Sequence, residues 1–263
     1  MRVAIVGGGA SGRAIQRALT ERGATAELFS RTTGFDVLTD DATARLGDAE
    51  VIVEATGRFT ISRRAATDFF TRSTRAVAEA ARTSGARHVL LSIVNGDLPQ
   101  VQGYGYLAGK TAQEHVARQE SPELTIVRST QWFEFAAQNL DRMTLGPVAL
   151  VPAMTIQPVA LDAVADVIAE AATGTRVGAL HEIAGPEATT LWDMTAQLPG
   201  KRVTPIPLRI PTRYGRAFRN GTLLPSAGIE VVGPRYAEWL NSRSTSSDAL
   251  RSAGQNPAGE TTR

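Results

Sequence analysis

The sequence predicts an α/β fold, in which a doubly wound parallel sheet carries a smaller C-terminal region. Three observations favour this. Short apolar segments rich in β-branched residues alternate with segments of helical periodicity through the first half of the chain. A glycine-rich turn directly follows the first apolar segment, and prolines become frequent after about residue 130. With 263 residues and 43% hydrophobic content, the chain can bury a core of this kind.

The predicted elements follow one another along the first 130 residues. Buried strands are expected at residues 2–6, 25–29, 51–55, 88–94 and 124–129. Helices are expected between them, at residues 10–22, 41–46, 65–84 and 103–120. The first helix ends at Gly23, a residue type that commonly stops helices. Strands separated by helices are typical of a parallel sheet that is covered on both faces.

The second half of the chain is expected to form a region of shorter elements over the mouth of the sheet. Helices are expected at residues 161–173 and 234–242, and a strand at 179–184. We therefore predict a dinucleotide-binding core over residues 1–130 and a substrate-binding region over 131–242, interleaved with the last core elements. Residues 243–263 are polar and lack periodicity, which predicts a disordered tail.

Composition excludes several classes of function. The formal net charge is only +2, and no block of like charge resembles a nucleic-acid-binding arm. There are no cysteines, which excludes disulfides and thiolate sites, and the three histidines are too dispersed to predict a metal centre. No export signal or membrane-spanning apolar run is visible, so we expect a cytoplasmic protein that binds a small molecule and no membrane. The oligomeric state does not follow from the sequence.

The turn after the first strand reads GGGASG, from residue 7 to residue 12. Gly7, Gly9 and Gly12 match the spacing G-x-G-x-x-G in the required context of strand, turn and helix. Such a turn lets the backbone approach a pyrophosphate, which the N–H groups of Ala10 and Ser11 at the start of the helix would bind. The alternative, a purely structural glycine turn, is less consistent with this position.

The end of the second strand indicates which dinucleotide is bound. NAD sites usually carry an acidic residue there, whereas this strand ends with Ser30 and Arg31. Serine does not repel a 2′-phosphate and arginine can pair with it, which favours NADP while leaving NAD possible. Arg13 could add positive charge. The alternative is that Arg31 is an ordinary solvated arginine.

Tyr106 and Lys110 are four residues apart in a predicted helix, so both side chains can address one ligand. A phenol with its usual pKa near 10 is a poor base, and we expect the neighbouring ammonium to lower the pKa of Tyr106. Ser92 ends the preceding strand, where its hydroxyl could orient a substrate carbonyl. Gly109 interrupts this helix at a cost of about 1 kcal/mol, for which close approach of the cofactor or of a neighbouring helix would account.

Together these motifs resemble the short-chain dehydrogenase/reductase superfamily. The resemblance extends over about residues 1–242 and is carried by the glycine turn, LFSR (28–31), FDV (35–37), VIVEATG (51–57), HVLLSIV (88–94) and Y-x-x-x-K (106–110). Later segments are similar to its atypical, NmrA-like NAD(P)H-binding branch, namely TIVRSTQWFEF (125–135), IQPVALDAVADVIAE (156–170), HEIAGPE (181–187) and GPRYAEWL (233–240).

The resemblance implies a Rossmann core and assigns roles to individual residues. Near the cofactor it implies Asp36 and Val37 at the adenine, with Ala55, Thr56 and Gly57 further along. It implies Tyr106 as acid/base, Lys110 on the nicotinamide ribose and Ser92 as a partner of Tyr106. Trp132, Phe133 and Glu134 would flank the substrate cleft, although they could equally begin an ordinary amphipathic helix.

Two features depart from the related branch. Its glycines are usually spaced G-x-x-G-x-x-G, whereas Val6 occupies the first of those positions here. The asparagine found in many active relatives has no clear equivalent in DFFTRSTRAV (68–77).

The leading hypothesis is an NADP-dependent oxidoreductase that acts on a small carbonyl or quinone-like substrate. The alternative is a redox sensor that binds NADP(H) without catalysis. A sugar-nucleotide epimerase or dehydratase is disfavoured, because 263 residues leave little room for a nucleotide-sugar domain.

Overall fold

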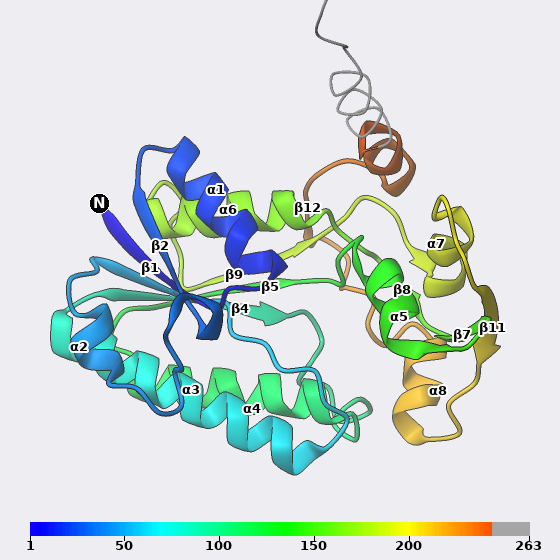
Figure 1. The fold of residues 1–263 in the computed structure, drawn as a ribbon, viewed down its shortest axis with the longest axis horizontal. Coiled ribbons are helices and arrows are strands. Elements are labelled where there is room, and N and C mark those ends of the chain that lie inside the picture. Colours follow the sequence, from blue (N-terminus) through cyan, green and yellow to red (C-terminus); the bar gives the residue numbers. More distant parts are fainter. Residues whose placement is uncertain (244–263) are drawn as a thin grey trace, which may run out of the picture.

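A computed structural model describes residues 1–243 of the chain. Its centre is a sheet in which all strand pairs are parallel, in the order β12-β9-β5-β4-β3-β1-β2 (Figure 1). The strands are β1 (Arg2–Val6), β2 (Thr25–Phe29), β3 (Val51–Glu54), β4 (Arg87–Ile93), β5 (Leu124–Ser129), β9 (Leu180–Ala184) and β12 (Glu230–Val231). The predicted α/β class and parallel sheet are confirmed.

Helices cover both faces of this sheet, as a doubly wound fold requires (Figure 1). On one face lie α1 (Ala10–Glu21) and α6 (Leu161–Thr173), and on the other α2 (Ala42–Leu46), α3 (Arg63–Ser84) and α4 (Gly105–Glu120). Successive side chains of a strand point to opposite faces of the sheet, so each strand contributes to the hydrophobic core on either face. In β1, for example, Val3 and Ile5 pack with the residues of α1 and α6, whereas Ala4 and Val6 pack on the side of α2 and α3.

The order of the strands reverses between β1 and β3. From β1 the chain first adds β2 on one side and then crosses to build β3, β4 and β5 on the other. Ligands of open parallel sheets bind at such a switch point, in the crevice outside the carboxyl ends of the strands. The glycine-rich turn that leaves β1 and residues 55–57 that leave β3 meet at this edge of the sheet.

A smaller region lies beyond that edge (Figure 1). It contains a sheet of order β11-β7-β6 and a second pair, β10-β8. Its elements are α5 (Phe135–Met143), β6 (Thr144–Leu145), β7 (Val148–Pro152), β8 (Thr155–Ile156), β10 (Thr189–Thr190), α7 (Leu191–Gln197), β11 (Thr204–Leu208) and α8 (Arg213–Arg219). Because α6, β9 and β12 return to the large sheet, the two regions interleave along the chain.

Local sequence signals account for the helix ends in the core. The Asp41 side chain accepts a hydrogen bond from the Ala44 N–H (3.0 Å) and begins α2, and Ser62 caps α3 in the same manner. Gly85, in the left-handed region at φ 73°, ends α3. Residues 236–243 are also helical, near the predicted 234–242. Apart from residue 243, the predicted tail lies outside the described residues.

Residues 1–243 lack two features that would bear on function. No helix in this part of the chain is both long and apolar enough to cross a membrane. The same residues contain no group of three or more metal-binding side chains that could hold an ion.

Candidate functional site

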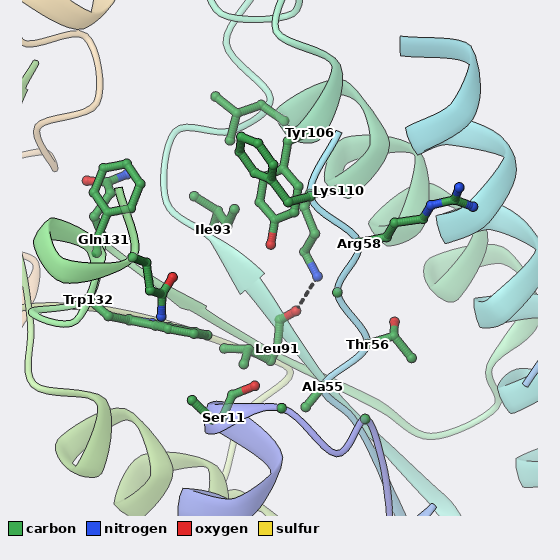
Figure 2. Close-up of a pocket in the computed structure, with 18 of the residues that line it drawn as sticks. Ser11, Ala55, Thr56, Arg58, Leu91, Ile93, Tyr106, Lys110, Gln131 and Trp132 are labelled. Atoms are coloured by element: carbon green, nitrogen blue, oxygen red, sulfur yellow. Dashed lines mark hydrogen bonds between the residues drawn. The ribbon is translucent and has the colours of Figure 1, made fainter. Parts of the chain in front are cut away.

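A cavity of about 1100 Å³ opens between the carboxyl edge of the large sheet and the smaller region. Ligand pockets typically measure about 300 to 1,000 Å³, so this cavity is slightly larger than the usual range. Its wall includes the glycine-rich turn, the ends of β2, β3 and β4, the start of α4 and side chains from α5 and α8. Figure 2 shows side chains from several of these elements facing the same space.

The glycine-rich turn has steric reasons for its glycines. Gly7 has φ 129°, and a Cβ there would lie 2.4 Å from the Ala55 carbonyl oxygen. A Cβ on Gly12 would lie 1.8 Å from the Gly7 carbonyl oxygen, so Gly12 allows α1 to pack against the turn. Gly12 itself is not part of the cavity wall, which Gly7, Gly9, Ala10 and Ser11 line.

Gly9 provides the free approach that a phosphate needs. No atom lies within 4 Å of the position that a Cβ on Gly9 would occupy, and Gly9 is the N-cap of α1. The first N–H groups of α1 therefore lie at an open part of the wall, where a helix N-terminus attracts anions. Arg13 has a different role from the one considered above: its Nη1 donates to the Gly8 carbonyl (2.7 Å) and thus supports the turn, outside the cavity wall.

The loop after β2 brings Arg31, Asp36 and Val37 to the wall. Arg31 is exposed, and no ion pair links it to another described residue. Asp36 is held within its own loop, where its Oδ1 accepts from the Leu38 N–H (3.0 Å). Arg31 is therefore free to meet an anionic ligand at the end of β2.

Ala55, Thr56 and Gly57 line the cavity at the end of β3, as expected. Thr56 also points to a residue that the sequence reasoning missed, because its hydroxyl donates to Glu54 Oε1 (2.9 Å) behind the wall. Glu54 is fully buried. Its carboxylate also accepts from Thr74 Oγ1 (2.9 Å) and from Gln113 Nε2 (2.7 Å). An acidic residue within the apolar segment VIVEA was the available signal.

Tyr106 and Lys110 both reach the cavity from α4 (Figure 2). Lys110 is only 4% exposed; its Nζ donates to the Leu91 carbonyl (2.6 Å) and to Gln113 Oε1. Burial lowers the pKa of Lys110 to about 8, although the carboxylates of Glu54 and Glu114 oppose the shift.

The expected lowering of the Tyr106 pKa is wrong in direction. Burial raises the pKa of Tyr106, and the opposing charge is that of Arg142 on α5. The Lys110 ammonium is directed to the Leu91 carbonyl, while the Tyr106 ring packs edge-on against Phe70 at 5.7 Å between centroids. In this arrangement Tyr106 is a protonated phenol at neutral pH, and hence an acid.

Ser92 reaches the cavity wall and is 2% exposed. Side chains alternate along β4, so Ser92 shares a face with His88 and Leu90, which pack on the side of α4. Ile93, on the opposite side of the strand, projects into the cavity (Figure 2). The role of Ser92 as a partner of Tyr106 stays a prediction.

The glycines at the start of α4 are explained by its packing against α3. A Cβ on Gly109 would lie 2.6 Å from Phe70 Cδ2 and 2.8 Å from Ala66 Cβ. A Cβ on Gly105 would lie 2.4 Å from the Ile61 carbonyl oxygen. Only glycine fits at these two positions, because α3 and the loop before it come so close. The close packing compensates for the low helix propensity of glycine.

Of the three residues predicted to flank the substrate cleft, Trp132, Phe133 and Glu134, only Trp132 lies at the cavity. Trp132 lines it, with its Nε1 donating to Ser129 Oγ (3.0 Å). Phe133 is buried instead against Tyr236, at 5.1 Å between ring centroids. Glu134 is the N-cap of α5, away from the wall. The expectation that all three flank the cleft is wrong, because consecutive side chains of this turn point in different directions.

The comparisons with known proteins give a fold and no family. No protein-family model matches the sequence, and no curated protein matches it. Among solved structures, UDP-N-acetylglucosamine 4-epimerase from Bacillus cereus is similar with a TM-score of 0.65 at 12% identity, covering 98% of this chain and 99% of that chain.

Two reductases are similar in the same way. The NADPH-dependent quinone oxidoreductase of Escherichia coli, complexed with NADPH, gives a TM-score of 0.62 at 18% identity and covers 92% of this chain and 99% of that one. The triphenylmethane reductase of Citrobacter sp., complexed with NADP(H), gives 0.63 at 13% identity with the same coverages. At these identities the similarity establishes the Rossmann-like fold alone. The narrower NmrA-like resemblance stays a prediction.

Proposed function

We propose that the protein is an NADP(H)-dependent oxidoreductase that transfers hydride between the nicotinamide and a small carbonyl or quinone-like substrate. The observation that carries this proposal is a single cavity that joins the glycine-rich turn to Tyr106 and Lys110. A dinucleotide-binding turn and an acid on the same wall are what such a reaction needs.

The wall fits the proposed cofactor. The open approach to Gly9 and the N-terminus of α1 suit the pyrophosphate. Arg31 suits a 2′-phosphate, while NAD remains the alternative cofactor. Asp36, Val37 and Lys110 also line the cavity, which is compatible with the adenine and ribose contacts that we propose for them. Two of the similar structures described above contain NADPH or NADP(H), in agreement with this choice.

In the proposed reduction, Tyr106 donates a proton to the substrate oxygen while the bound cofactor supplies the hydride. The raised pKa of Tyr106 keeps its proton in place until the substrate binds. Ser92 would orient the same oxygen. Lys110, whose pKa of about 8 leaves it largely charged at pH 7, would bind the ribose and stabilise the phenolate that remains.

Two alternatives are distinguished by specific features. An epimerase was disfavoured on length, but the Bacillus cereus epimerase is covered over 99% of its own chain, so length is no objection. The mostly apolar wall that the smaller region contributes is a better reason against a sugar nucleotide, because α5 supplies only Gln138, Asn139 and Arg142 as polar partners there. The NADP(H) sensor remains the second candidate, because cofactor binding alone would leave the same turn and cavity.

Replacing Tyr106 by Phe tests the enzyme against the sensor. We expect NADPH oxidation with a panel of quinones and aldehydes to fall about 100-fold, the size of a lost general acid, while the Kd for NADPH is unchanged. Tyr104→Phe, in the same helix start, should lose much less. A parent protein that binds NADPH tightly and turns over no member of the panel would favour the sensor.

A further inference from the structure

The part of the cavity contributed by the smaller region is mostly apolar and carries four aromatic side chains, besides the polar side chains of Gln131, Gln138, Asn139 and Arg142. Its wall includes Trp132, Phe135, Met154, Leu208, Tyr214 and Phe218. The Trp132 ring is held in place by its hydrogen bond to Ser129, and Tyr214 and Phe218 pack on each other with centroids 5.6 Å apart. Preorganised aromatic walls of this kind favour a flat apolar ligand, because it can stack on the rings and displace water.

Arg142 is the only charged side chain that the smaller region contributes to the described wall. It lies in the last turn of α5, with its Cζ 4.7 Å from the centroid of the Phe59 ring and its Nη2 donating to Gln138 Oε1 (3.2 Å). No ion pair joins it to a carboxylate of residues 1–243. An arginine can stack on an aromatic ring and form an ion pair at the same time. The contact with Phe59 therefore leaves the Arg142 guanidinium able to pair with an anion.

The charges of the rest of the wall also favour an anionic ligand. Asp36 is the one acidic side chain along its described part, and it belongs to the loop after β2 at the cofactor end. Arg31, Arg58 and Lys110 lie with Asp36 on the part of the wall contributed by the core. Because the proposed cofactor would engage that part, the positive charge of Arg142 is left for the second ligand.

Resting on the proposed function, we infer that the substrate is an aromatic carbonyl or quinone that carries one anionic group, and that Arg142 binds this group. The aromatic body lies against the apolar wall and the carboxylate or sulfonate meets the guanidinium. For an aldehyde, the carbonyl carbon accepts the hydride that NADPH supplies and its oxygen takes the Tyr106 proton, giving the alcohol and NADP⁺.

Binding of an anionic substrate at Arg142 would also affect the protonation of Tyr106. The charge of Arg142 partly opposes the effect of burial on Tyr106. An anion paired with Arg142 cancels that opposition, so the bound substrate stabilises the protonated phenol.

Matched probe pairs test the inference. The first pair is 4-formylbenzoate and its methyl ester; the second is 1,2-naphthoquinone-4-sulfonate and 1,2-naphthoquinone. In Arg142→Gln, kcat/KM with NADPH should fall about tenfold or more for the charged member and less than twofold for the neutral one. Arg142→Lys should recover part of the loss. The matched control Arg216→Gln removes an exposed arginine of α8 outside the cavity wall, and should change neither.

The possible outcomes separate this inference from the proposed function. Equal losses for charged and neutral probes, or no loss for either, would overturn the role of Arg142 while leaving the oxidoreductase intact. If no probe is turned over, the proposed function fails, and calorimetry with NADP⁺ and each charged probe decides the inference by itself. A Kd for the charged probe that is the same in the parent and in Arg142→Gln would then refute it.

Discussion

The buried carboxylate of Glu54 should be a major contributor to stability. Its Oε1 accepts from Thr56 Oγ1 (2.9 Å), Thr74 Oγ1 (2.9 Å) and Gln113 Nε2 (2.7 Å). On its other side, Oε2 lies 3.4 Å from His88 Nε2, and both side chains are 0% exposed. Glu54→Leu removes a charge and the acceptor of these donors at once, without removing much volume.

The size of the effect follows from this burial. Removing a buried carboxylate leaves its hydrogen-bond donors desolvated and unpaired, at about 1 to 3 kcal/mol for each group, so the total loss should be about 3 to 5 kcal/mol. In a domain of this size, 1 kcal/mol corresponds to about 2 to 4 °C in Tm. We therefore expect Glu54→Leu to lower the Tm by about 10 °C. Glu27→Leu, which replaces an exposed acid on the edge strand β2, should stay within about 0.5 kcal/mol.

The dependence on pH gives a sharper test. Burial raises the pKa of Glu54, but His88, Lys110 and Thr74 outweigh burial and leave the pKa below its ordinary value. A carboxylate with a lowered pKa stabilises the fold above its unfolded pKa of about 4.3, and this contribution is lost as pH falls through the folded value.

Guanidinium unfolding at pH 7 and at stepwise lower pH measures this contribution. The difference between the parent and Glu54→Leu should be largest at pH 7 and shrink below about pH 4. A loss under 1 kcal/mol at pH 7, or a difference that stays constant into acid, would refute the reasoning.

Two further predictions concern the cofactor. Arg31→Ala should weaken NADPH far more than NADH in titration calorimetry, because only NADPH carries the 2′-phosphate; an equal loss for both would exclude this arginine as the phosphate partner. The pKa of Lys110, about 8, predicts that NADPH binds more weakly as pH rises through that value, since the ammonium becomes neutral. Lys110→Met should remove this step from the pH profile, and a step of the same size in that variant would contradict its assignment to Lys110.

The core elements could be predicted because their signals are local. The strand that ends at Val6 and the helix that follows it need only an apolar run, a glycine turn and a helical period. The smaller region could not be predicted in the same way. Its strand β7 pairs with β11, which begins at Thr204 far along the sequence, and β6 and β8 are two residues each. Pairing over such a distance depends on the tertiary fold and not on local propensity.

Most of the residues predicted for the site line one cavity, whereas their roles stay predictions. The spacing of Tyr106 and Lys110 suffices to put both at one cavity, because a helix fixes which side chains share a face. The sign of the Tyr106 pKa shift depends on burial by residues that are distant in sequence, which no spacing reveals. The sequence did not single out Glu54 and Arg142 for the same reason. Their contacts are with residues that only the fold brings next to them.

Helix α4 shows how packing sets the chemistry of the candidate site. Gly105 and Gly109 lie one turn apart and let α3 and the preceding loop approach closely. The ring centroid of Phe70 in α3 then lies 5.1 Å from Lys110 Nζ, and the same ring packs on the Tyr106 ring. This packing contributes to the burial that lowers the pKa of Lys110 and raises that of Tyr106. Gly105 and Gly109 thus influence the surroundings of Tyr106 indirectly, because they allow α3 to pack closely against α4.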